Sequence, residues 1–402
     1  MPTLAVLSLH TSPLVQPGAG DSGGMNVYVR ELASSLAQAG VSTEVFVRRW
    51  RDDLPDVVPV EPGFRVVHVP AGPIGLAKEE LPGVLDEFTE RTAELLAGRD
   101  ISALHANYWL SGVVGHRLKH ALELPLVSTF HTLARVKADS GDPEPEARER
   151  AEGEVIGCSD AVLASCDTEA HQLEHLYGAD PVRIEIVPPG VDHAFFSPGD
   201  QAGARQALGL GPHPVLLFVG RIQPLKGLDV AIEALHRLPQ RDAVLVVVGG
   251  SSGADGNAEV ARVRALIAER GLTERVRFVP PQPHHLLSTY YRAADVVVVP
   301  SRSESFGLVA LEAAACGVPV VGAAVGGLRT LVDHGRTGFL VEGRDPEVMS
   351  SYVSEILDSP ALARELGTAA ARTARGYTWS TTAARLRRIY ADLSARSLVR
   401  CS

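Results

Sequence analysis

The chain has 402 residues, of which 45% are hydrophobic and 21% are charged. This balance is typical of a globular protein rather than a disordered chain, and the length favours two domains over one core. The formal net charge of −10 excludes a general attraction to nucleic acid or acidic lipid, so any anionic ligand must be held by a local basic site. No apolar run is long enough to span a bilayer, and the N-terminus lacks the basic flank of a signal peptide. We therefore expect a cytoplasmic protein.

The four cysteines, Cys158, Cys166, Cys316 and Cys401, form no CxxC pair and have no histidine cluster beside them in the sequence. Such spacing is typical of reduced thiols in a cytosolic protein.

In the first half of the chain, short apolar runs alternate with helical patterns. The runs predicted to be strands buried on both faces are Leu4–Leu9, Glu44–Val47, Val66–Val69, Leu126–Ser128 and Val162–Ala164. Met25–Ala39 has the apolar stripe of a helix. The charged run Asp142–Glu154 is interpreted as a solvated helix face.

A glycine-rich loop lies between the first strand and the first helix, from Gly18 to Asn26. Glycines allow close approach of the backbone to a ligand, and the free N–H groups of a helix start attract phosphate. The loop matches neither the P-loop pattern nor GxGxxG. By itself it leaves phosphate contact and a plain structural turn equally open.

The second half repeats the alternation after a segment with three prolines and two glycines, residues 187–200, which reads as a linker. The predicted strands are Val215–Val219, Leu245–Val248, Val276–Val279, Val296–Val299 and Val320–Val321. The predicted helices are Leu228–Leu238, Ala258–Glu269, Leu308–Ala315 and, near the C-terminus, Ser380–Leu393. The alternation predicts an α/β fold with parallel sheets. A single large α/β domain is the alternative to two domains.

Two basic residues follow a predicted strand of the second half. Arg221 and Lys226 stand in the stretch from Gly220 to Gly227, directly after Val215–Val219. Open α/β sheets bind ligands at the carboxyl ends of their strands, and this pair of charges suits a diphosphate. Solvated surface charge is the alternative, and the flanking glycines and the preceding buried strand make it the weaker one.

Two carboxylates follow the next strand. Glu304 lies on a predicted loop, and Glu312 lies among apolar residues of a predicted helix, where an unpaired carboxylate is costly. Contacts to ribose or sugar hydroxyls account for both positions. Pairing of Glu312 inside the fold is the alternative.

The pattern Gly-Arg…Lys-Gly followed by Glu-x7-Glu resembles the retaining glycosyltransferases of family 4, over nearly the whole chain. The resemblance implies the GT-B fold, with two facing Rossmann-like domains, a cleft between them and a C-terminal helix crossing back. The implied boundaries are 1–193 for the acceptor-binding domain, 194–375 for the nucleotide-sugar domain and 376–402 for the returning helix.

Further stretches resemble one subgroup of that family. They start at His10, Asp21, Lys78, Tyr108, His131, Pro145 and Ser303. This resemblance implies transfer of N-acetylglucosamine from UDP-N-acetylglucosamine to 1D-myo-inositol 3-phosphate, the first step of mycothiol biosynthesis, by a homodimer.

The resemblance also implies roles for individual residues. The acceptor set is Asp21, Ser22, Gly23, Gly24, Met25, Asn26, Lys78, Tyr108, Thr132 and Arg148. The nucleotide-sugar set is His10, Gln16, Pro17, Gly24, Arg221, Lys226, Gln282, Glu304 and Glu312. The catalytic set is Arg221, Lys226, His131 and Glu304.

Mg²⁺ is implied at main-chain carbonyls of Tyr291, Arg292, Ala294 and Val318, although the usual threonine is replaced by Val318. No Asp-x-Asp pair holds a catalytic ion. The segment Ala138–Glu144 is shorter than the family pattern, and Gln282 replaces the usual arginine.

With no evident nucleophile, retention favours front-face displacement, in which Arg221 and Lys226 neutralise the departing diphosphate. A covalent route through a carboxylate is the alternative mechanism. The competing functions are a family 4 transferase with another nucleotide sugar or phosphorylated acceptor, and a catalytically silent nucleotide-sugar binder.

Overall fold

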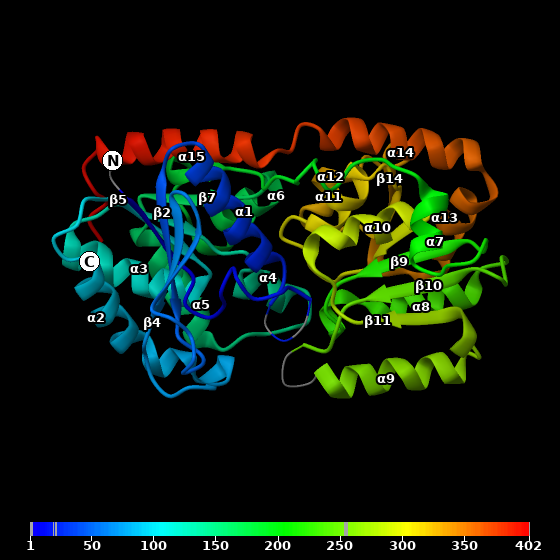
Figure 1. Cartoon of the computed structure of the whole chain (residues 1–402), viewed down its shortest axis with the longest axis horizontal. Helices are drawn as coiled ribbons and strands as arrows, with labels where there is room; N and C mark the ends of the chain where they lie inside the picture. Colours follow the sequence, from blue (N-terminus) through cyan, green and yellow to red (C-terminus); the bar gives the residue numbers. More distant parts are fainter. Residues whose placement is uncertain (1–2, 19, 21, 253–255, 402) are drawn as a thin grey trace. The chain divides into compact units, whose positions relative to one another are not determined.

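The computed structural model describes residues 3–18, 20, 22–252 and 256–401. The chain divides into two compact units (Figure 1). The first unit comprises residues 1–15, 25–188 and 379–402, and the second comprises residues 16–24 and 189–378. The alternative of one large α/β domain is therefore wrong.

The first unit is built on a sheet in which β3 lies at one edge and β8 at the other. The strand order is β3-β4-β2-β1-β5-β6-β7-β8, and every pairing is parallel except β3 with β4. The strands are β1 (Thr3–Leu7), β2 (Ser42–Arg48), β3 (Val57–Glu61), β4 (Phe64–Val69), β5 (Ile101–Asn107), β6 (Leu126–Thr129), β7 (Ala161–Ala164) and β8 (Ile184–Ile186).

Helices bury both faces of this sheet. They are α1 (Gly24–Gln38), α2 (Leu85–Leu96), α3 (Trp109–Leu122), α4 (Ala134–Asp139), α5 (Glu146–Cys158), α6 (Asp167–Tyr177) and α15 (Trp379–Ser394), with 3-10 turns η1 (Lys78–Val84) and η2 (Pro181–Arg183). Side chains alternate along β1, so Leu4 and Val6 share a core with α1 and α15. Ala5 and Leu7 share the opposite core with α2 and α3.

The C-terminal helix α15 returns to the first unit, as predicted. Its apolar face, which includes Trp379, Leu386 and Ile389, is buried in the core that contains β1 and α1. At the start of the helix, the Thr382 hydroxyl donates to the Pro188 carbonyl oxygen over 2.7 Å. The last helix is therefore part of the first unit.

The second unit has a fully parallel sheet of order β11-β10-β9-β12-β13-β14. The strands are β9 (Val215–Val219), β10 (Val244–Val248), β11 (Val276–Val279), β12 (Val296–Val299), β13 (Val320–Ala323) and β14 (Gly338–Val341). The helices are α7 (Gln201–Ala207), α8 (Leu228–Arg237), α9 (Gly256–Glu269), α10 (Leu287–Ala293), α11 (Leu308–Ala315), α12 (Leu328–Leu331), α13 (Pro346–Asp358) and α14 (Pro360–Ala374). The 3-10 turns are η3 (Pro224–Lys226), η4 (Thr273–Arg275), η5 (His284–Leu286) and η6 (Glu342–Arg344). Leu216 and Phe218 of β9 pack with α8 and α13 in its core.

All ten strands predicted from apolar runs are present, with small shifts at their ends. The sequence analysis missed β3, β5, β8 and β14. It missed β5 because the seven residues of this strand include Ser102, His105 and Asn107 and so do not form an apolar run. His105 is nevertheless fully buried, since its ring nitrogens bond the hydroxyls of Tyr390 and Thr129 over 2.8 and 2.9 Å. A buried polar side chain with satisfied hydrogen bonds is compatible with a central strand.

The structure differs from the prediction of four reduced thiols at two of the cysteines. Cys158 and Cys401 are joined as a disulfide-bonded pair, although 243 residues separate them in the sequence. His116 and His120 lie beside this pair. Local spacing along the chain contains no signal for such a contact. Cys166 and Cys316 are buried thiols.

Within the part of the chain that the structure describes, no helix combines the length and the apolarity that crossing a membrane requires.

Candidate functional site

Most of the candidate residues follow strands beside the switch point of their own sheet. In the first sheet, β1 lies between β2 and β5, and in the second sheet, β9 lies between β10 and β12. Open α/β sheets bind ligands at the carboxyl ends of such strands, where successive connections diverge. His10 and Tyr108 follow β1 and β5, while Arg221 and Glu304 follow β9 and β12.

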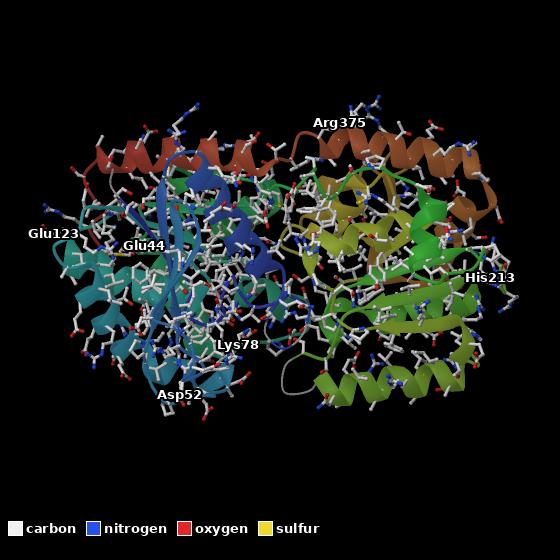
Figure 2. All side chains as sticks on the ribbon, in the orientation of Figure 1. Glu44, Asp52, Lys78, Glu123, His213 and Arg375 are labelled. Carbon is white, nitrogen blue, oxygen red and sulfur yellow. A yellow bond between two sulfur atoms is a disulfide. The ribbon has the colours of Figure 1, made fainter. Side chains whose placement is uncertain are left out.

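Tyr108 is the centre of the candidate residues of the first unit. The His10 ring lies 4.4 Å from the Tyr108 ring, measured between centroids. The Lys78 ammonium nitrogen is 4.9 Å and the Arg148 guanidinium carbon 5.0 Å from the same ring centre. Lys78, at the start of η1, is labelled in Figure 2. Two cations are thus gathered around one phenol ring, an arrangement in which the ring attracts both electrostatically.

The backbone holds Tyr108 in an unusual conformation. It precedes α3 and has φ of 75°, in the region that side chains other than glycine rarely adopt. Its amide donates to the Thr129 carbonyl oxygen of β6 over 2.8 Å. A strained residue held by the sheet is typical of functional sites.

Arg148 is 3% exposed, on the first turn of α5. Its Nε donates to Glu152 over 2.8 Å, its Nη1 lies 2.8 Å from Glu144, and its Nη2 donates to the carbonyl and hydroxyl oxygens of Thr132, each over 3.1 Å. Burial by itself would lower the pKa of Arg148, but Tyr108, Glu152 and Glu144 together raise it. The interpretation of Asp142–Glu154 as a solvated face is therefore wrong at Arg148 and Glu152, which turn inward because they pair with each other.

Glu144 also contacts the Lys137 ammonium group. One carboxylate is therefore shared by two cations, Lys137 and Arg148. The sequence analysis did not single out Glu144 or Lys137. Their only signal in the sequence is opposite charge within the short segment before α5, which is common on solvated surfaces.

His131 lies in the loop after β6, with φ of 62°. Its Nε2 is 2.9 Å from the amide oxygen of Asn107, the last residue of β5. Burial, with a smaller effect of His105, lowers the pKa of His131 to about 3. The ring is neutral at pH 7, so it is suited to hydrogen bonding rather than to holding a positive charge. The analysis missed Asn107 because it belongs to β5, a strand that was not predicted.

Asn26 is 2% exposed, in the first turns of α1. Its amide nitrogen donates to the Thr11 hydroxyl over 2.5 Å and to the Ser12 carbonyl over 2.7 Å. These bonds fix the segment after β1. Met25 packs at the border of both cores of the first unit. Asp21 lies outside the described residues.

Part of the glycine-rich loop, residues 16–24, groups with the second unit and lies against Arg221. The Nη1 of Arg221 donates to the Gly20 carbonyl over 3.3 Å and to the Ser252 hydroxyl over 3.1 Å. A Cβ at Gly23 would stand 3.1 Å from the Arg221 Nε, closer than most real contacts. Gly23 therefore has a specific reason to be glycine: a larger residue would disturb the guanidinium.

The start of the loop lies beside the segment after β11. The Gln16 amide donates to the Pro281 carbonyl over 2.8 Å, and Gly18 lies so close to Pro281 that its Cβ would stand 3.1 Å away. Gln282 turns its amide onto the Pro280 carbonyl over 2.9 Å. Two of the predicted nucleotide-sugar residues, Gln16 and Gln282, are thus held near each other.

Lys226 and Glu304 form an ion pair at the carboxyl ends of β9 and β12. The Ser301 hydroxyl also donates to Glu304, over 2.8 Å. The structure therefore joins the basic motif and the first of the two glutamates into one group, a pairing that their separation of 78 positions does not reveal.

Glu312 is 5% exposed, on α11, with a partner at each oxygen. Its Oε1 is 2.7 Å from His284 Nε2, and its Oε2 accepts from the Tyr291 hydroxyl over 2.7 Å. Burial and Glu312 raise the pKa of Tyr291 well above its usual value, so the phenol keeps its proton. The alternative of pairing inside the fold is thus realised, and each carboxylate oxygen keeps further capacity to accept.

The carbonyls predicted to hold Mg²⁺ cluster around the end of α10, except that of Val318. The Tyr291 carbonyl accepts from the Ala294 amide over 3.0 Å, and the Ala294 carbonyl accepts from Gln201 over 3.0 Å. The Arg292 side chain donates to the Ser197 carbonyl over 2.8 Å. The set contains no carboxylate, and Mg²⁺ in proteins is usually bound through one or two carboxylates. These residues fit the ion poorly.

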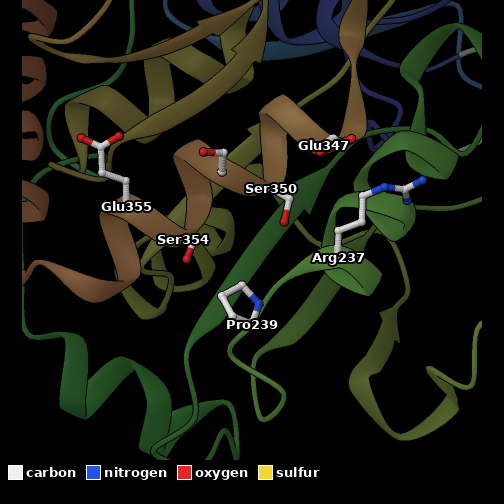
Figure 3. A pocket seen from close by; sticks show the side chains of 7 residues that line it. Arg237, Pro239, Glu347, Ser350, Ser354 and Glu355 are labelled. Carbon is white, nitrogen blue, oxygen red and sulfur yellow. The ribbon is translucent and has the colours of Figure 1, made fainter.

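A pocket of the second unit lies between α8 and α13 (Figure 3). It is lined by Arg237, Pro239, Glu347, Ser350, Ser351, Ser354 and Glu355. None of these residues belongs to the candidate sets, so we assign it no part in the site.

Comparison with known proteins agrees with this arrangement. Residues 23–190 match the family described as glycosyl transferase 4-like domain, and residues 200–373 match glycosyl transferases group 1. Sucrose-phosphate synthase from Thermosynechococcus elongatus superposes with a TM-score of 0.93 at 34% identity, covering 98% of this chain and 100% of that one. HepE from Anabaena, in complex with UDP and glucose, has a TM-score of 0.80 at 19% identity and shows the same fold, with the same coverage. The protein is a glycosyltransferase of the GT-B fold.

Curated relatives narrow the class. D-inositol 3-phosphate glycosyltransferase 2 of Catenulispora acidiphila is 48% identical over 98% of this chain and 95% of its own length. D-inositol 3-phosphate glycosyltransferase of Actinosynnema mirum is 48% identical over 95% of both chains. The chain belongs to the D-inositol 3-phosphate glycosyltransferase family.

Proposed function

We propose that this protein transfers N-acetylglucosamine from UDP-N-acetylglucosamine to 1D-myo-inositol 3-phosphate with retention at the anomeric carbon, as the first step of mycothiol biosynthesis. The observation that carries the proposal is the gathering of Lys78 and Arg148 around Tyr108 in the first unit. In a chain with a net charge of −10, such a local pair of cations is what a small phosphorylated acceptor requires.

The first unit would hold the acceptor. Arg148 and Lys78 would neutralise its phosphate, and the Thr132 hydroxyl, already 3.1 Å from Arg148, would add a donor. The Tyr108 hydroxyl and Asn26 would bond ring hydroxyls. Because Glu144 pairs with Arg148, an arriving phosphate would compete with this carboxylate. The acceptor phosphate would thus take the place of the Glu144 carboxylate at Arg148.

The second unit would hold the nucleotide sugar. Arg221, whose Nη1 donates to neutral oxygens, would exchange these partners for diphosphate oxygens. Lys226 would contact the diphosphate from the other side, and Glu304 would accept from a sugar hydroxyl. Glu312, positioned by His284 and Tyr291, would accept from the ribose.

In the reaction, the bond between the anomeric carbon and the β-phosphate oxygen breaks, and the bond to the acceptor oxygen forms on the same face. The acceptor proton passes to the departing β-phosphate, and UDP leaves. The protein contributes position and charge rather than a base. Glu304 is ion-paired with Lys226, which favours this route over a covalent one.

His131, with a pKa of about 3, would act on the sugar as a neutral hydrogen-bonding group. His10 and Pro17 keep their predicted nucleotide-sugar roles as hypotheses. Since the carbonyls of Tyr291, Arg292, Ala294 and Val318 fit Mg²⁺ poorly, we route no step through a metal ion. A cytoplasmic location and a homodimer also stay predictions, and sedimentation of the purified protein tests the latter.

The alternative is a related transferase with another phosphorylated acceptor. The similarity to sucrose-phosphate synthase at 34% identity favours a sugar phosphate as that acceptor. Both functions use the same cations, so only the hydroxyl pattern of the acceptor separates them.

The test is an acceptor and donor panel with the purified enzyme. UDP-N-acetylglucosamine, UDP-glucose and ADP-glucose are each combined with inositol 3-phosphate, unphosphorylated inositol and fructose 6-phosphate. Nucleotide release is measured, and the product's anomeric configuration is determined by NMR. We expect the highest kcat/KM for UDP-N-acetylglucosamine with inositol 3-phosphate, and an α-linked product.

Equal efficiency with inositol and inositol 3-phosphate would contradict phosphate recognition. Preference for fructose 6-phosphate would support the alternative acceptor. Binding of UDP-N-acetylglucosamine without turnover on any acceptor would identify a silent binder.

A further inference from the structure

Two histidines and two cysteines meet in the first unit, in a group that sugar transfer does not use. His116 and His120 lie one turn apart on α3, Cys158 is the last residue of α5, and Cys401 lies in the tail after α15. One ligand atom from each lies within 4.8 Å of the other three. Figure 1 shows the chain's C-terminus beside α3.

Three of the distances between sulfur and nitrogen atoms match those of a tetrahedral zinc site, whereas the two sulfur atoms are bonded to each other in this structure and must separate before both can bind an ion. Cys401 Sγ is 3.2 Å from His120 Nε2 and 3.7 Å from His116 Nε2, and Cys158 Sγ is 3.4 Å from His120 Nε2. In zinc sites the Zn–S and Zn–N bonds are about 2.3 and 2.0 Å, so tetrahedral angles separate sulfur from nitrogen by about 3.5 Å. The three measured separations scatter around this value.

The elements that carry the four side chains are fixed independently of any metal. The Val399 amide donates to Asp160 over 2.7 Å, which brings the tail to Cys401's position. Asp160 in turn pairs with the buried Lys119 ammonium group over 2.7 Å, and Lys119 donates to the Cys158 carbonyl over 2.8 Å. A network of this kind positions metal ligands from outside the coordination sphere.

We propose that His116, His120, Cys158 and Cys401, with both cysteines reduced, bind one Zn²⁺ as a structural site. A ligand set of two thiolates and two imidazoles favours Zn²⁺ over harder ions such as Mg²⁺. Four protein ligands leave no open position, so the ion fastens the tail to α3 and α5 rather than taking part in catalysis. The disulfide of Cys158 with Cys401 is the competing state, because both states need the same two sulfur atoms.

The site lies at the C-terminal ends of two helices whose N-terminal ends carry acceptor candidates. α3 begins directly after Tyr108, and α5 carries Arg148 in its first turn. The proposal is nevertheless independent of the substrate, because its test measures metal content and stability rather than transfer.

The experiment uses the full chain without an affinity tag, purified in a phosphine reductant, exposed to excess Zn²⁺ and desalted. We expect one zinc per chain by mass spectrometry of the metal, and a lower Tm after removal of the ion with a strong chelator. Replacement of Zn²⁺ by Co²⁺ should give the intense visible bands of tetrahedral cobalt and a near-ultraviolet thiolate charge-transfer band.

Cys401→Ser and His120→Ala test the ligand set. Both should lose the bound zinc and the thiolate band. Cys401 lies near the end of the chain and His120 is exposed, so neither change should prevent folding. The matched control is His175→Ala, from the exposed group of His171, Glu174 and His175 on α6, which should keep one zinc.

Three results would overturn the proposal. One is a reduced chain that stays free of zinc, and another is retention of zinc by both ligand variants. The third is a Cys158–Cys401 disulfide that persists when thiols are trapped directly in a reducing lysate.

Discussion

In the first unit the candidate arginine is buried between two carboxylates, whereas in the second unit the candidate arginine follows β9 and contacts the glycine-rich loop. Arg148 pairs with Glu144 and Glu152, while the Nη1 of Arg221 donates to Gly20 and Ser252, both neutral. An anion at Arg148 must compete with an existing charge, whereas an anion at the Nη1 of Arg221 would displace a carbonyl and a hydroxyl oxygen. Under the proposed function, we expect the first unit to tune acceptor affinity and the second unit to supply charge for the departing diphosphate.

The largest effect is expected in the second unit. Lys226→Ala should lower kcat by roughly a hundredfold or more, because a charge-assisted contact to the leaving group is lost. UDP release at saturating substrates measures it, and the melting curve checks folding. Arg237→Ala, an exposed cation of the same unit, is the control and should keep normal kcat. Normal turnover in both Lys226→Ala and Arg221→Ala would end this interpretation.

The stability of the first unit should also depend on pH. Burial lowers the pKa of His105 from 6.5 to about 3, so between these values the unfolded ring binds a proton that the folded ring does not. The free energy of unfolding is therefore undiminished above about pH 6.5 and falls on acidification, by about 1.4 kcal/mol per pH unit from this group.

The three tryptophans, Trp50, Trp109 and Trp379, all belong to the first unit. Denaturant unfolding followed by tryptophan fluorescence from pH 7 to pH 4 therefore reports on that unit. His105→Gln should flatten the pH dependence, and His213→Gln, at an exposed position labelled in Figure 2, should not. Parallel slopes in both variants would contradict the assignment to His105.

Arg148→Lys tests whether the arginine of the first unit acts on the acceptor alone. A lysine keeps the charge but loses the planar fork, so the KM for the acceptor should rise about tenfold while the KM for the nucleotide sugar stays constant. Initial rates with each substrate varied in turn measure both. Arg150→Lys, at an exposed position of the same helix, serves as the reference. Equal increases in both constants would point to a general loss of structure.

The smallest effect concerns the internal carboxylate. Glu144→Gln removes the charge that Arg148 and Lys137 share, so the acceptor KM should fall about threefold, in the range of a partly exposed ion pair. Glu146→Gln, at an exposed position on α5, should leave it unchanged. A higher KM in Glu144→Gln would mean that the carboxylate positions Arg148 for the acceptor instead of competing with it.

The sequence by itself determined the α/β architecture, ten strands and the basic motif of the second unit. Strands such as Val296–Val299 are visible because both faces of a parallel sheet are apolar. The basic motif between Gly220 and Gly227 could be recognised in the sequence because its residues lie close together in the chain. The candidate residues of the first unit were found through their joint resemblance to a family, since Lys78, Tyr108 and Arg148 lie far apart in the chain.

Only the tertiary structure decided which partners these residues have. The pairing of Lys226 with Glu304 and the contact of Cys401 with His120 join positions that lie far apart in the chain and share no local pattern. Glu144 and Glu152 are each four positions from Arg148, but only the fold shows that Arg148 is buried between them. β5 was missed because it contains polar residues, and the hydrogen bond of the buried His105 ring to Tyr390 of the last helix cannot be seen in the sequence. Hydrophobic periodicity predicts which side chains are buried. Long-range ion pairs, buried hydrogen bonds and metal ligands depend on which distant segments the fold brings together.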